Sequence, residues 1–113
     1  MPLDVAQTER QIKSLNDSEL SVFFTRLIYE LTLSTRAIIG EKQRAEETIP
    51  ALKEINEFQH LLSSQILNIY SGSPHRMTPD AIVSRFYSSD DSDLQIQHEL
   101  RTAFEAAIDS IRK

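Results

Sequence analysis

Cysteine is absent from this 113-residue sequence, which excludes disulfide bonds, thiolate metal sites and cysteine nucleophiles. The absence also fits the reducing environment of the cytosol. Only two glycines occur, where average usage would supply about eight in a chain of this length. Glycine-rich phosphate loops and strained Gly-x-Ser-x-Gly nucleophile turns are therefore absent as well.

Long hydrophobic runs are also missing. The most apolar region, LSVFFTRLIYELTL, is interrupted by Arg26 and Glu30, so it is not a membrane span. The first residues, MPLDVAQTERQIKSL, lack the basic region and apolar stretch of a signal peptide. The formal net charge of −5 opposes electrostatic attraction to nucleic acid and to anionic lipid. We expect a cytoplasmic protein with no membrane partner and no nucleic-acid partner.

The residues that are abundant favour helices, and valine and glycine are scarce. We predict an all-α fold in which residues 1–113 form a single helical-bundle domain. The bundle is up-and-down, with two long antiparallel helices at residues 17–39 and 50–70. Two short helices, at about 4–14 and 78–87, and a C-terminal helix complete it.

Three helix starts carry capping patterns. Asn16 and Glu19 match a capping box ahead of the first long helix. Thr78 followed by Pro79 predicts an N-cap and a first helical residue for the short fourth helix. Ser92 is placed to cap the C-terminal helix.

Glycine and proline suggest the remaining boundaries of the long helices. Gly40 stands where a left-handed residue would end the first long helix. Pro50 suits a first helical turn, so the second long helix is expected to begin near Thr48 and to end at Gly72. The preceding stretch EKQRAEET is either a loop or an early exposed turn of this helix.

The helix predicted at 17–39 has two apolar faces, whereas the other helices have one. Its main stripe consists of Leu20, Phe23, Phe24, Leu27, Ile28, Leu31 and Ile38. A second stripe, Val22, Tyr29 and Leu33, lies on nearly the opposite side, with Arg26 and Arg36 at its rim. A helix that is apolar on two faces is buried on two faces. The second stripe therefore belongs either to the chain's own core or to an interface with another protein, and the sequence leaves both open.

The pair Glu57-x-x-His60 has the spacing of half a carboxylate-bridged di-metal site. Such a site needs inward-facing ligands, yet helical periodicity points both side chains away from the core face that contains Phe58. The one similar pair, Gln95 and His98, substitutes an amide for a bridging carboxylate. We therefore expect no metal site and no cofactor.

Other catalytic and nucleic-acid patterns are weak. The three histidines are scattered, and no inward-facing pair of carboxylates is visible for acid–base chemistry. His75, Arg76 and Arg85 gather near the start of a short helix, as in a recognition helix. Asp80 and the acidic run SSDDSD lie beside them, and no basic stripe continues onto another helix.

These observations favour a non-enzymatic protein-interaction module, a small homodimeric regulator or adaptor. Its interface residues would be Val22, Arg26, Tyr29, Leu33 and Arg36, with Tyr29 as the anchor, because aromatic and arginine side chains are favoured at interface centres. The alternative is a small helical enzyme or ligand-binding protein with a site at a dimer seam. A deep polar pocket between helices would favour the alternative, and a flat apolar patch around Tyr29 would favour the interaction module.

Overall fold

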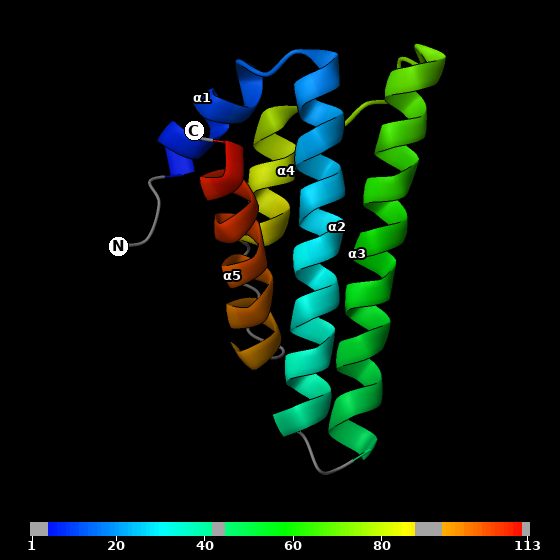
Figure 1. The fold of residues 1–113 in the computed structure, drawn as a ribbon, viewed down its shortest axis with the longest axis vertical. Coiled ribbons are helices and arrows are strands. Elements are labelled where there is room, and N and C mark those ends of the chain that lie inside the picture. Colours follow the sequence, from blue (N-terminus) through cyan, green and yellow to red (C-terminus); the bar gives the residue numbers. More distant parts are fainter. Residues whose placement is uncertain (1–4, 42–44, 88–93, 112–113) are drawn as a thin grey trace.

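A computed structural model describes residues 5–41, 45–87 and 94–111 of the chain. These ranges contain the helices α1 (Val5–Lys13), α2 (Asp17–Glu41), α3 (Ala45–Ser71), α4 (Pro79–Phe86) and α5 (Leu94–Ile111). Figure 1 shows α2 and α3 running antiparallel beside each other, with α5 along another side of α2. The predicted all-α bundle of two long antiparallel helices, a C-terminal helix and two short helices is confirmed.

Two of the predicted helix starts have the expected hydrogen bonds. The backbone N–H of Glu19 donates to Asn16 Oδ1 at 2.8 Å, and the N–H of Asn16 donates to Glu19 Oε1 at 3.0 Å. This reciprocal pair satisfies N–H groups that α2 itself leaves without partners. At α4, Thr78 is extended and its Oγ1 accepts a bond from the N–H of Ala81 at 3.4 Å. The cap predicted at Ser92 lies outside the described residues.

Two predicted boundaries are wrong. Gly40 does not end its helix, since α2 continues to Glu41 and, in the described residues, the one glycine with positive φ is Gly72 at the end of α3. A glycine inside a helix costs about 1 kcal/mol, which weakens the helix without breaking it. Pro50 does not mark the start of α3, which begins at Ala45. Pro50 is the sixth residue of α3, so it removes one intrahelical hydrogen bond, to the carbonyl four residues earlier, and the helix tolerates this loss in its second turn.

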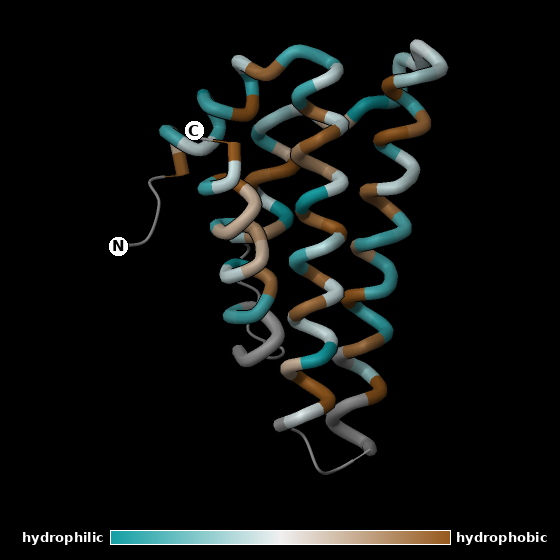
Figure 2. The backbone as a smooth tube through the Cα atoms, in the orientation of Figure 1, coloured by the Kyte–Doolittle hydropathy of each residue, from teal (hydrophilic) through white to brown (hydrophobic). Residues whose placement is uncertain are grey.

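α2 is the central helix of the bundle. It packs along α3 and along α5, while α4 packs against α1 and α5. Figure 2 shows hydrophobic residues recurring along α2 and α3 between hydrophilic ones, as one-sided burial requires. The main stripe of α2 is the buried one, and Phe23, Leu27 and Leu31 are 0% exposed.

The core is organised around all five phenylalanines of the chain, which come from four helices. Their rings follow one another from α2 through α5 and α4 to α3. The centroid distances are 5.7 Å from Phe24 to Phe23, 5.8 Å from Phe23 to Phe104, 4.8 Å from Phe104 to Phe86 and 5.1 Å from Phe86 to Phe58. Aromatic pairs at these separations contribute roughly 0.5–1.5 kcal/mol each beyond the burial of their surface. The aromatic chain therefore joins the four helices to one another.

Side chains of α3 hold the loop that leads to α4. Gln65, which is 7% exposed, accepts a hydrogen bond from the backbone N–H of Met77 at 2.8 Å. Asn68 Nδ2 donates to the carbonyl of His75 at 2.7 Å. These bonds fix the loop before α4 to the second half of α3.

Candidate interaction surface

The second stripe of α2 is exposed. Val22 is 61% exposed, Tyr29 52% and Leu33 37%, although each is a large apolar or aromatic side chain. The interpretation that the chain's own core includes this stripe is therefore wrong for the described residues. α3 and α5 flank α2 and leave the face between them uncovered. Monomeric proteins seldom leave long apolar lines open to water. The stripe remains available to another molecule.

Arg26 and Tyr29 form a structured pair on this face. The Arg26 guanidinium lies 5.1 Å from the centre of the Tyr29 ring, and its Nη2 is 3.8 Å from Glu30 Oε2. The Glu30 side chain is 10% exposed, whereas the Arg26 side chain is 46% exposed. A cation over a tyrosine ring contributes about 0.5–1 kcal/mol at an exposed site. The two contacts hold Arg26 across the surface, beside the ring that is the proposed anchor.

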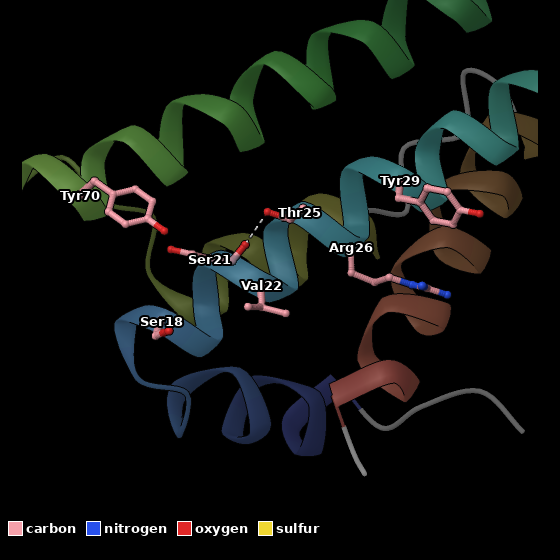
Figure 3. Close-up of a pocket in the computed structure, with 7 residues that line it drawn as sticks. All are labelled: Ser18, Ser21, Val22, Thr25, Arg26, Tyr29 and Tyr70. Atoms are coloured by element: carbon pink, nitrogen blue, oxygen red, sulfur yellow. Dashed lines mark hydrogen bonds between the residues drawn. The ribbon is translucent and has the colours of Figure 1, made fainter.

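An open groove of about 450 Å³ adjoins the second stripe, between the first half of α2 and the last turns of α3. In Figure 3, the Tyr70 ring of α3 lies near Ser21 at one end of the groove and Tyr29 lies at the other. Ser21 is 6% exposed and its Oγ atom has no hydrogen-bond partner. The groove is lined by Ser18, Ser21, Val22, Thr25, Arg26, Tyr29 and Tyr70.

The threonines of this face are engaged with the chain itself. Thr25 Oγ1 donates to the carbonyl of Ser21 at 2.9 Å, and Thr32 Oγ1 donates to the carbonyl of Ile28 at 3.1 Å. From α3, Gln59 Nε2 donates to the same Ile28 carbonyl at 3.1 Å and to Thr32 Oγ1 at 3.0 Å. Because each threonine proton is already used, these hydroxyls have only acceptor positions left for a ligand.

The candidate metal ligands are not brought together. Glu57 and His60 are exposed on α3, as their wheel positions predict, and His98 is exposed on α5. The side chain of Gln95 lies outside the described residues. Within the described residues, no group of three histidine, aspartate or glutamate side chains is placed to hold a metal ion.

The basic residues near α4 have partners inside the chain. Arg76 Nη2 lies 2.6 Å from Asp17 Oδ1, which connects the loop before α4 to the start of α2. The Arg85 guanidinium lies 5.0 Å from the centre of the Phe58 ring. Each of these two arginines therefore has a contact within the chain, and neither needs a nucleic-acid phosphate to explain its position.

Sequence reasoning missed three residues of this surface: Ser21, Glu30 and Tyr70. Ser21 and Glu30 are polar yet buried, and a pattern based on apolar positions does not include them. The spacing between Arg26 and Glu30 is one sign of their ion pair that the sequence did contain. Tyr70 reaches the groove because antiparallel packing brings the end of α3 beside the start of α2.

Comparison with models of protein families, with curated proteins and with solved structures finds no match to this chain. Among the described residues, no helix combines the length and the apolar character needed to cross a membrane.

Proposed function

We propose that this protein is a non-enzymatic protein-interaction module that acts as a homodimer, in the role of a small cytoplasmic regulator or adaptor. The observation that carries the proposal is the exposure of Val22, Tyr29 and Leu33 on the central helix of the bundle. Arg26 and Arg36 lie at the rim of this stripe. An exposed aromatic anchor with arginine beside it has the composition of an interface centre.

Burial of the stripe and the cost of association are of similar size. Full burial of a large apolar side chain is worth roughly 1.5–3 kcal/mol, and a two-fold dimer buries Tyr29 and Leu33 once on each side. Association costs roughly 4–15 kcal/mol in lost translational and rotational freedom. The stripe must therefore be supplemented by its rim, and we expect association at micromolar rather than nanomolar concentrations.

The groove supports the interaction module better than the small enzyme or ligand-binding protein. It is open rather than enclosed, and its described lining contains no carboxylate or imidazole that would serve as a general base. Its ionisable groups are Arg26 and two tyrosines. Such a lining suits the side chains of a partner helix.

The direct test is Tyr29→Glu, measured by light scattering at micromolar protein concentration. We expect a wild-type dimer and a folded monomeric variant, because burying an unpaired carboxylate at the seam is strongly unfavourable. Val5→Glu is the matched control. Val5 is also an exposed large apolar residue, 46% exposed, but it lies on α1, so this variant should remain a dimer.

Two outcomes would contradict the proposal. Unfolding of Tyr29→Glu, monitored by far-UV circular dichroism, would place Tyr29 in the protein's own core. A monomeric wild-type protein, or a Tyr29→Glu variant that is still dimeric, would remove the second stripe from any homodimer interface.

A further inference from the structure

The second stripe is part of a longer seam on α2. Starting at Glu19, residues spaced alternately by three and four positions run to Gly40, and all seven are exposed. This alternation is the spacing at which two helices pack along their length. Figure 3 shows Val22, Arg26 and Tyr29 of this series projecting from α2. We call these residues the seam: Glu19, Val22, Arg26, Tyr29, Leu33, Arg36 and Gly40.

We propose that the seam pairs with the seam of a second copy of this chain in antiparallel orientation, about a two-fold axis that passes between Leu27 and Ile28. The inference rests on the proposed homodimer and specifies its geometry. An antiparallel pair is self-complementary, because each contact made by one protomer is repeated by the other. The arrangement has three kinds of layer, each occurring twice.

Each layer joins side chains of matching chemistry. Val22 faces the partner's Leu33, which buries two apolar side chains together. Arg26 faces the partner's Tyr29, so that its guanidinium, already 5.1 Å from its own Tyr29 ring, lies between two aromatic faces. Glu19 faces the partner's Arg36, an ion pair at each end of the seam. Glu19 uses Oε1 in the capping box and keeps Oε2 for this pair.

Other registers of the same seam lose this complementarity. Shifting the partner by one heptad in one direction places Arg26 against the partner's Arg36, two like charges. Shifting it in the other direction places Val22 against the partner's Arg26 and Glu19 against the partner's Tyr29. Parallel pairing sets every residue against its own copy, so Arg26, Arg36 and Glu19 would each meet a like charge. Like-charge contacts disfavour the parallel pairing and the first shifted register. The second shifted register is disfavoured because it sets charged side chains against uncharged ones and loses both the ion pairs and the Val22–Leu33 contacts.

Disulfide trapping tests the register, and the absence of natural cysteine makes it unambiguous. Two single variants, Val22→Cys and Leu33→Cys, are oxidised separately and as a mixture, and then separated on a non-reducing gel. In the proposed register, the two cysteines of a mixed dimer face each other. In each separate dimer, the two copies of one cysteine lie about 16 Å apart along the helix axis. A disulfide requires Cα atoms within about 7 Å.

We expect a cross-linked dimer in the mixture and none in either variant alone. Cross-linking of each variant with itself would indicate parallel pairing and overturn the register while leaving the homodimer in place. A wild-type dimer without any cross-link would overturn the proposed register. A monomeric wild-type protein would overturn the proposed function and the register together.

Charge exchange supplies an independent readout. Glu19→Arg and Arg36→Glu should each be monomeric alone, because the end layers then contain like charges. An equimolar mixture should form a heterodimer, since every end layer again pairs a carboxylate with a guanidinium. Circular dichroism verifies that both variants remain helical, since Glu19 also belongs to the capping box. If the mixture stays monomeric while the wild type is a dimer, Glu19 and Arg36 do not face each other, and the register is overturned.

Discussion

Replacing Phe104 with alanine removes the ring at the centre of the aromatic chain. Phe104 is 0% exposed, and its ring lies 4.8 Å from Phe86, 5.8 Å from Phe23 and 5.6 Å from Tyr87. Truncating a buried phenylalanine costs roughly 3–5 kcal/mol. Because three ring contacts are lost together, we expect the upper half of that range, about 4–5 kcal/mol.

A loss of this size leaves the variant folded but much less stable than the wild type. A chain of 113 residues has a free energy of unfolding of roughly 6–17 kcal/mol at the usual stability per residue. A loss of 4–5 kcal/mol lowers Tm by roughly 15–20 °C for a domain of this size. Few other single substitutions in this fold should cost as much, since no other ring contacts as many neighbours across three helices.

Urea denaturation monitored by far-UV circular dichroism measures this loss, with all variants at one protein concentration because dimerisation also adds stability. The control is Leu67→Ala. Leu67 is 69% exposed, so its truncation should change the free energy of unfolding by less than about 0.5 kcal/mol. A Phe104→Ala variant as stable as this control would refute the aromatic chain as the centre of the core.

Two further outcomes test local features. Thr78→Ala should lower the free energy of unfolding by about 1 kcal/mol, because the hydroxyl that caps α4 is lost. Thr78→Ser keeps a hydroxyl and should retain most of the wild-type stability. Equal losses for the two variants in urea melts would show that the hydroxyl is not the cause. Burial, followed by the nearby charge of Glu105 and the hydrogen bond to its carboxylate at 3.1 Å, raises the pKa of the Tyr87 phenol. The neutral phenol therefore contributes stability that is fully present below about pH 10, the ordinary tyrosine pKa, and is lost as pH rises through the folded value. The difference in free energy of unfolding between wild type and Tyr87→Phe should be constant around neutral pH. Above about pH 10 the wild type should lose stability relative to the variant. A difference that does not change with pH would contradict the raised pKa of Tyr87.

Local sequence patterns predicted the helix starts that depend on short-range hydrogen bonds. Asn16 with Glu19, and Thr78 with Pro79, act within a single turn, so no distant residue is needed for them to form. The buried face of each helix was also predictable, because helical periodicity places Phe23 and Leu27 on one side whatever packs there.

Helix boundaries inferred from glycine and proline alone were harder to predict than those with a capping pattern. Gly40 and Pro50 are residues that weaken a helix, and either can be tolerated inside one when packing outweighs the local cost. α2 and α3 pack against each other, which offsets these penalties. Burial of Gln65 has a similar origin, because its partner Met77 lies beyond the end of α3, in a loop whose position only the fold determines.

Whether the second stripe is buried or exposed depends on tertiary structure alone. Periodicity placed Val22, Tyr29 and Leu33 opposite the main stripe, but it did not determine which helices would cover them. That depends on where α3 and α5 lie around α2, and both pack at its sides. Helical geometry relates the faces of one helix to each other, whereas coverage of a face depends on contacts between residues far apart in the chain. For this reason the sequence left two interpretations of the stripe, and the structure leaves it exposed.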